Sequence, residues 1–172
     1  MAVITDIQLR PLELADADAM AQFANNNKVQ INLRDNLPLP YTTENAHSFI
    51  SNTQNQQPAL HFAIEYNGQF AGVVGLLLHT DSVLKSAEVG YWIGEPFWGK
   101  GIATRVLQAI TQLGFRRLKL NRLFAGVFEW NKAGMRVLEK CGYQLEGISY
   151  KHIRKNGQLV DEYWYGRTST FY

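Results

Sequence analysis

The sequence predicts an α/β protein of the α+β kind, with a mixed, mostly antiparallel sheet flanked by about four helices. Two pairs of apolar, alternating stretches flank Asn-Gly dipeptides, which are favoured in tight hairpin turns, at Asn67-Gly68 and Asn156-Gly157. Stretches with apolar residues three and four positions apart predict helices before the first of these hairpins and between the two. One strand–helix–strand unit, near residues 87–128, provides the single crossover expected of such a sheet.

The bulk composition predicts one globular domain, residues 1–172, with a buried core. Seventeen basic and fifteen acidic side chains leave a net charge of +2, which is too small to indicate a nucleic-acid partner. The apolar runs are too short to cross a membrane, and residues 1–10 do not resemble a secretion signal. The single cysteine, Cys141, excludes an internal disulfide framework. We therefore expect a cytoplasmic protein without nucleic-acid or membrane partners.

The first part of the chain predicts one strand and two helices. The expected elements are an edge strand at 7–12, a helix at 14–26, an irregular segment at 28–41 and a helix at 43–50, followed by a polar break at 52–58. Thr43 is the expected N-cap of the second helix, because threonine side chains accept hydrogen bonds from the first free backbone amides.

The rest of the chain predicts two hairpins around a strand–helix–strand–helix segment. The expected elements are strands at 60–66, 69–78 and 87–93, a helix at 102–118, a strand at 123–128, a helix at 131–141, and strands at 143–154 and 159–166. Gly142 directly follows the helix expected at 131–141. Helices often end in a left-handed glycine, so we expect Gly142 to terminate this helix.

The stretch Phe97-Trp98-Gly99-Lys100-Gly101-Ile102-Ala103-Thr104 carries the clearest functional signal. It joins a predicted strand to a predicted helix, and its glycines leave backbone N–H groups uncovered. The positive end of the helix dipole adds to them, so the segment predicts a site for a phosphate-bearing ligand. The alternative is a tight turn that binds nothing. The spacing fits neither a P-loop nor the three-glycine dinucleotide fingerprint.

Together with residues 87–93, and with Asn131 and the run Leu138-Glu139-Lys140-Cys141-Gly142-Tyr143, this stretch resembles the GNAT acetyltransferase superfamily. The resemblance is to the RimJ/RimL-like branch, which acetylates protein N-termini and various small amines. It covers nearly the whole chain and is stronger after about residue 60. It implies a GNAT-like sheet with a central splay between the strands near Ile93 and Leu123.

The resemblance implies acetyl-CoA as co-substrate. The four histidines and the single cysteine have no metal-ligand spacing, so we expect no metal. The pantetheine arm would pair with the backbone around Ile93, Gly94 and Glu95, and Asn131 would donate or accept a hydrogen bond along that arm. Lys132 or Arg105 would lie near the adenosine phosphates. The pyrophosphate would lie over the turn, so the remaining expected cofactor residues are Trp98, Gly99, Lys100, Gly101, Ile102, Ala103 and Thr104.

The implied reaction is direct attack of an amine on the thioester carbonyl, with the oxygen polarised by backbone N–H groups of residues 93–95. Glu88 is the candidate base, because several GNAT relatives place a carboxylate on this strand. The alternative is a structural carboxylate paired with a basic neighbour. His79 and His152 are other candidates for the base. His79 ends a predicted strand, where a solvent-facing structural position is the favoured interpretation.

No general acid is assigned by the sequence. The branch often has a serine three residues after the asparagine, but this chain has Gly134 there. Other members carry a tyrosine further along the same helix, where this chain has Leu138. Cys141 lies on an apolar helical face, so we expect it to be a buried structural thiol rather than a nucleophile.

The resemblance places the acceptor near Arg34, Tyr41, His152 and whichever of Tyr91 or Trp92 faces the site. The acceptor class stays open among a protein N-terminus, an aminoglycoside, a polyamine and an amino acid analogue. A homodimer through the β-rich C-terminal part is compatible with the sequence. Two other functions are considered: a non-catalytic acyl-CoA-binding module on the same fold, and a plain nucleotide- or phosphate-binding protein.

Overall fold

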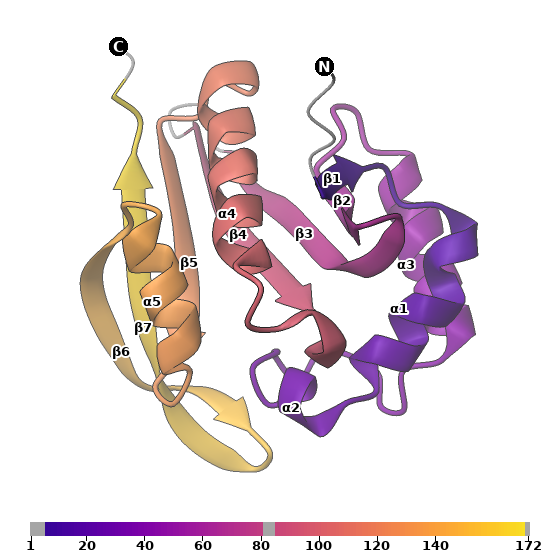
Figure 1. The fold of residues 1–172 in the computed structure, drawn as a ribbon. Helices are drawn as coiled ribbons and strands as arrows, with labels where there is room; N and C mark the ends of the chain where they lie inside the picture. The colour runs from indigo at the N-terminus through magenta and orange to yellow at the C-terminus, as the bar shows by residue number, and fades with distance from the viewer. Residues whose placement is uncertain (1–5, 81–84, 171–172) are drawn as a thin grey trace. The chain divides into compact units, whose positions relative to one another are not determined.

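The computed structural model describes residues 6–80 and 85–170. These residues form a mixed, mostly antiparallel sheet of seven strands in the order β1-β2-β3-β4-β5-β7-β6, with five α-helices (Figure 1). The chain divides into two compact units, residues 1–75 with 91–102 and residues 76–90 with 103–172. The predicted fold class is confirmed, and one helix more than expected is present.

The sheet of the first unit begins with an antiparallel edge. Strand β1 (Ile7–Arg10) pairs with β2 (His61–Tyr66), and β2 pairs with the first part of β3 (Gln69–Thr80). The hairpin turn between β2 and β3 has both central residues left-handed, Asn67 at φ 49° and Gly68 at φ 77°. This is the backbone of the tight turn that the Asn-Gly dipeptide predicts, and it fixes the register of the pair.

The helices of the first unit pack on an apolar core. A short 3-10 turn, Leu14–Asp16, leads into α1 (Ala17–Ala24), which packs against α3 (Thr43–Gln54). The buried side chains beneath them come from both helices and from the sheet; they include Leu12, Met20, Tyr41, Ile50, Ala63, Phe70 and Val73.

Three expectations for this unit are wrong. Residues 28–41 are not wholly irregular, because the Asn26 side chain accepts from the Lys28 amide and starts the short helix α2 (Asn27–Gln30). Thr42, and not Thr43, caps α3: its hydroxyl accepts from the Asn45 amide, and the Asn45 side chain accepts from the Thr42 amide in return. The helix also continues to Gln54, past the expected end at residue 50, and its buried Thr53 donates to the Ile50 carbonyl at 2.9 Å.

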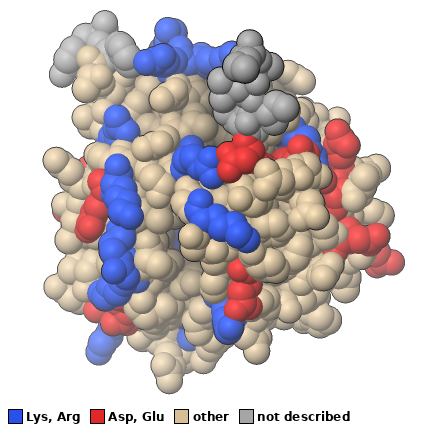
Figure 2. Space-filling view, viewed as in Figure 1, with Lys and Arg blue, Asp and Glu red and all other residues tan. Residues whose placement is uncertain are grey.

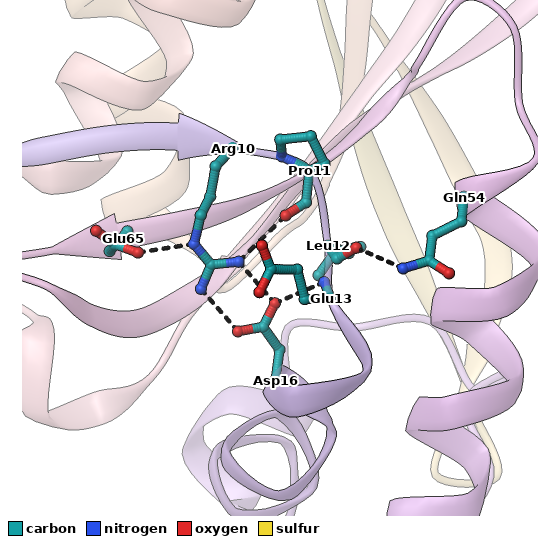
Figure 3. A network of polar contacts seen from close by, with 7 residues as sticks. All are labelled: Arg10, Pro11, Leu12, Glu13, Asp16, Gln54 and Glu65. Atoms are coloured by element: carbon teal, nitrogen blue, oxygen red, sulfur yellow. Dashed lines mark hydrogen bonds and ion pairs between the residues drawn. The ribbon is translucent and has the colours of Figure 1, made fainter.

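A polar network joins β1 to the start of α1 (Figure 3). The Arg10 guanidinium donates to both carboxylate oxygens of Asp16, at 2.7 and 2.8 Å, and to Glu65 at 2.7 Å. Asp16 is 5% exposed and also accepts from the Glu13 amide. Burial disfavours the charged carboxylate, but these hydrogen bonds outweigh it and hold the pKa of Asp16 below its ordinary value.

The second unit is a sheet covered by helices on one face. Strand β5 (Arg122–Phe128) pairs with β4 (Lys85–Ile93) in parallel and with β7 (Gln158–Thr168) antiparallel, and β6 (Gln144–Lys155) pairs with β7. Helices α4 (Ile102–Gln112) and α5 (Lys132–Lys140) belong to this unit from residue 103 onward. The helix expected at 102–118 ends as α-helix at Gln112 and continues as a π-helical turn, Leu113–Arg117.

Contacts from alternate residues of β7 place α5 on one face of this sheet. The Lys132 ammonium lies 5.2 Å from the centre of the Tyr163 ring, Tyr165 donates to Glu139, and Arg167 donates to the carbonyl of Cys141. Side chains of a strand alternate between faces, so the residues between these three point away from α5. Gly142 follows α5 at φ 79° and is the left-handed terminator that the sequence predicts.

Candidate active site

The glycine-rich turn is an exposed loop directly before Ile102, the first residue of α4. Gly99 and Gly101 have φ values of 73° and 70°, and a Cβ on either would meet no atom within 4 Å. Glycine is therefore required there by the backbone conformation and not by lack of space. Open backbone at a helix N-terminus is suited to an anion.

Side chains of the same unit brace this loop. The Trp98 indole donates to the Ile93 carbonyl at 2.7 Å, and the Lys100 ammonium donates to the Pro96 carbonyl at 2.6 Å. Lys100 also lies 5.8 and 5.7 Å from the ring centres of Tyr66 and Phe97. A positive charge is thus held beside the left-handed glycines.

The residues expected to receive the thioester arm already make some of their own contacts. The Gly94 amide donates to the Ala71 carbonyl at 2.8 Å. The Glu95 carboxylate accepts from Lys28 and, at 2.6 Å, from Asn26, and these bonds hold the pKa of Glu95 below its ordinary value. The Glu95 amide opens the 3-10 turn Glu95–Phe97, where the first N–H groups have no partner within the turn.

The residues of the first unit that are expected to contact the acceptor differ from one another in their surroundings. Tyr41 is 3% exposed and belongs to the core beneath α1 and α3. Trp92 packs on the same core, with its ring 6.2 Å from that of Phe70, so alternation along β4 turns Tyr91 to the other face. Arg34 is half-buried in the segment after α2.

Glu88 occupies a special position in the second unit. Ser86, Ala87 and Glu88 of β4 pair with Arg122, Leu123 and Phe124 of β5. Among the described residues of this unit, the parallel pairing ends at Glu88, although β5 continues to Phe128. Ala87 and Val89 are buried and Glu88 is half-buried, so Glu88 lies on the Phe124 face of the sheet at the last paired position.

Asn131 and Lys132 open α5. The Asn131 side chain caps the helix by accepting from the Gly134 amide at 3.0 Å, and a Cβ at position 134 would lie 2.8 Å from the Asn131 amide nitrogen. Gly134 thus leaves room for the Asn131 side chain.

Basic side chains follow one side of α5. Lys132, Arg136 and Lys140 are exposed at every fourth residue, and Figure 2 shows basic side chains as a band over α5. Further toward the N-terminus of this unit, Ala103 and Thr104 are half-buried and Arg105 is exposed.

Neither Cys141 nor Leu138 offers acid or nucleophilic chemistry. Leu138 is 2% exposed and Cys141 is 3% exposed. Burial raises the pKa of the Cys141 thiol, which donates to the Thr104 carbonyl, so the reactive thiolate is disfavoured. The expectation of a structural cysteine agrees with these contacts.

A buried glutamate that the sequence analysis missed lies on the face of β7 away from α5. Glu162 is 0% exposed, and its Oε2 lies 3.6 Å from Nε2 of His152, whose side chain is half exposed. The signal was a carboxylate in the same alternating register as Val160 and Trp164 of a half-apolar strand. A polar residue at such a position requires a reason.

Four rings cross this face of the second unit. His79 lies 5.2 Å from Phe124, Phe124 lies 6.0 Å from Trp164, and Trp164 lies 6.3 Å from His152, measured between ring centres. We call these four side chains the aromatic row. Glu88 pairs with Phe124, so the candidate base and the row share one face of the sheet.

Within residues 6–80 and 85–170, none of the helices has the length and apolar content needed to cross a membrane.

Comparison with known proteins connects this arrangement to a family. The family model described as "Acetyltransferase (GNAT) domain" matches residues 6–144. A relative from Bacillus subtilis, "Probable N-acetyltransferase YjcK", is 32% identical over 162 residues, which cover 90% of each chain. Spermidine N(1)-acetyltransferase of Escherichia coli is 30% identical over 153 residues, covering 88% of this chain and 80% of the relative.

Solved structures show the same fold. A RimL ribosomal L7/L12 alpha-N-protein acetyltransferase in complex with coenzyme A superposes with a TM-score of 0.85 at 26% identity, covering 96% of both chains. Mycobacterium smegmatis RimJ, in complex with CoA-disulfide, gives a TM-score of 0.87 at 24% identity, covering 95% of this chain and 82% of the other. The predicted resemblance to the RimJ/RimL-like branch is thereby confirmed.

Proposed function

We propose, given that this chain belongs to the GNAT acetyltransferase family and is an acetyl-CoA-dependent N-acetyltransferase, that it acetylates a primary amine by direct attack of the amine on the thioester. The observation that carries this proposal is Glu88 at the last parallel pair of β4 and β5. This carboxyl group lies where the described pairing of β4 with β5 ends, which supports its role as the base. The whole chain, residues 1–172, acts as one acetyltransferase domain.

The glycine turn supports coenzyme A as the carrier. The diphosphate of coenzyme A would lie on the backbone of residues 98–104, where Gly99 and Gly101 are exposed and left-handed. Lys100 contributes a positive charge from within the turn. Lys132 heads the basic band over α5 and, with Arg105, is suited to the adenosine phosphates, while the Asn131 amide is suited to the pantetheine arm. The RimL structure bound to coenzyme A supports the same carrier.

In the proposed reaction, the amine nitrogen bonds to the carbonyl carbon, and Glu88 accepts a proton from that nitrogen. The oxygen that gains charge accepts a hydrogen bond from the Glu95 amide, because the Gly94 amide already donates to Ala71. The carbon–sulfur bond then breaks, and the coenzyme A thiolate takes its proton from water. Gly134 and Leu138 give this step no side-chain acid, and a thiolate leaves readily without one.

The acceptor we propose is a primary amine on a small molecule or at a protein N-terminus. Both kinds occur among the similar proteins, as spermidine and as ribosomal protein L7/L12. Tyr91 and Arg34 of the first unit and His152 of the second are the side chains proposed to contact it. The non-catalytic alternative loses its basis, because the family assignment is to enzymes.

Two measurements test this function. Acetyl-CoA binds only the folded chain, so at about a hundred times its dissociation constant it should add about 2.7 kcal/mol of stability and raise the melting temperature. Glu88→Gln should keep that shift but reduce kcat by about a hundredfold or more. Glu44→Gln, an exposed glutamate on α3, is the matched control and should change neither quantity. An unchanged melting temperature, or full activity in Glu88→Gln, would refute the binding or the base assignment respectively.

A further inference from the structure

We propose that His152 binds the acceptor amine and that Glu162 is a positioning residue that orients the His152 ring. The inference rests on the proposed acetyl transfer and adds to it the group that holds the acceptor. All the contacts that support it lie within the second unit.

The backbone of β6 is specially shaped at His152. Ser149 pairs with Glu162 and Ile153 pairs with Val160, so four steps on β6 match two on β7, and the extra residues form a bulge. Lys151 is left-handed at φ 48°, and its amide donates to the Asp161 carboxylate at 2.9 Å. Bulges redirect side chains and are frequent beside active sites. This one turns the imidazole of His152 toward Glu162 and Trp164.

Glu162 is a carboxyl side chain with 0% exposure. Burying a carboxylate costs several kcal/mol, so a position of this kind calls for a structural or functional reason. Gly126 of β5 makes room for the carboxylate, because a Cβ there would lie 2.3 Å from Glu162 Oε1. The chain thus accommodates a buried charge whose Oε2 faces the half-exposed His152. A carboxylate behind a histidine is a common means of fixing the ring and its tautomer.

The orientation defines what His152 offers to a ligand. Its Nε2 faces the carboxylate, which favours the proton on that nitrogen and leaves the Nδ1 lone pair as an acceptor. Trp164 packs against the imidazole, and its own indole N–H donates to the Ser149 hydroxyl at 3.1 Å, so the packing surface is fixed. An acceptor N–H group other than that of the reacting nitrogen can donate to Nδ1, and a carboxylate at Glu162 favours a cationic acceptor.

The pair lies on the same sheet face as the candidate base. Glu88 pairs with Phe124, and the aromatic row runs from Phe124 through Trp164 to His152. An acceptor that lies over this row can place its body at His152 and its reacting nitrogen toward Glu88. Aromatic faces also attract cations, which suits an amine substrate.

The competing explanation is that Glu162 only stabilises the β6–β7 hairpin. The two explanations differ in how the effects of substitutions combine. If Glu162 acts through His152, removing both side chains should cost no more than removing His152 alone. If Glu162 acts on the hairpin, its effect should be the same whether or not His152 is present.

The test measures thiol release from acetyl-CoA with three primary amines: spermidine, pentylamine and a peptide with N-terminal alanine. The best acceptor is then used with His152→Gln, Glu162→Gln and the double variant. We expect each single variant to raise the acceptor KM by about tenfold, with kcat and the acetyl-CoA KM changing by less than about threefold. The double variant should equal His152→Gln. His47→Gln, an exposed histidine on α3, should behave as wild type.

An unchanged acceptor KM in His152→Gln, or effects of the two substitutions that add, would overturn the proposal. His152 is half exposed, so its variant remains decisive if Glu162→Gln does not fold. Failure of the proposed function looks different: the wild-type chain would release no thiol with any of the three amines and would show no melting shift with acetyl-CoA.

Discussion

Asp16 in the first unit and Glu162 in the second are both buried carboxylates, but they have opposite surroundings. Asp16 receives two hydrogen bonds from Arg10 and one from the Glu13 amide. Glu162 faces the imidazole of a half-exposed histidine at 3.6 Å. An arginine stays protonated at every ordinary pH, whereas a histidine is accessible and able to exchange a proton.

The surroundings of a buried carboxyl group thus separate a structural role from a functional one. The Asp16 network ties β1 to the start of α1, and its Arg10 and Glu65 side chains are mostly buried, at 20% and 23% exposed. The Glu162 pair ends in a side chain that solvent reaches. We therefore expect substitutions around Asp16 to reduce stability and substitutions around Glu162 to reduce activity toward the acceptor.

Arg10→Leu should have the largest effect on stability. Removing the guanidinium leaves a buried carboxylate without its main partner, which should lower the free energy of unfolding by about 3 kcal/mol. Activity per folded molecule should not change. Chemical denaturation measures the loss, with the exposed Arg136→Leu as control. A loss no larger than that of the control would contradict the structural role given to this network.

Gly126→Ala should affect both properties and so sharpens the comparison. The new Cβ would lie 2.3 Å from Glu162 Oε1, so the carboxylate must shift. Overpacking of this kind costs about 2 kcal/mol. The acceptor KM should also rise, because His152 loses its orientation. Gly90→Ala, on β4 with no atom within 4 Å of its Cβ, is the control. Equal acceptor KM values in the two variants would count against the pair.

Gly101→Ala should cost about 1 kcal/mol, because a residue with a Cβ is disfavoured at a positive φ. It should also reduce the melting shift produced by acetyl-CoA, since the turn would relax away from the shape that binds the diphosphate. Gly68→Ala carries the same backbone strain in the β2–β3 hairpin, at φ 77°. That control should lose similar stability and keep the full acetyl-CoA shift; an equal loss of shift in both variants would remove the turn from cofactor binding.

The smallest expected effect is the change in the stability of the fold at low pH. The pKa of Asp16 lies below its ordinary value of 3.8 in the folded chain. Its contribution to stability is therefore complete above the unfolded-state pKa and is lost as the pH falls through the lower, folded-state pKa. The stability difference between wild type and Arg10→Leu should be largest near pH 7 and should shrink as the pH falls toward and below 3.8. A difference that grows toward low pH would reverse the assigned sign.

Local signals predicted much of the fold. The Asn-Gly turns fixed two hairpins because their left-handed backbone belongs to the dipeptide itself, as Asn156 and Gly157 show at φ 49° and 80°. Gly142 likewise ended α5 as expected. The short helix α2 escaped prediction because one side-chain cap at Asn26 starts it without any apolar periodicity.

Only part of the candidate site could be predicted from the sequence. The glycine turn was visible in the sequence because its chemistry is local to eight residues. Glu162 was not, since its meaning depends on a bulge in β6 and on the space that Gly126 leaves on β5. Nor does periodicity reveal that the Gly94 amide donates to Ala71, a residue of another strand. Pairings between distant strands supply what local patterns lack.

A titration of the isotope-labelled chain with coenzyme A, followed through the backbone amide signals, tests directly whether the glycine turn binds the carrier. We expect the amide signals of Gly99, Lys100 and Gly101 to shift strongly and saturate together, because these amides receive the diphosphate. If their signals remain unchanged while coenzyme A saturates the protein, the turn does not bind the carrier.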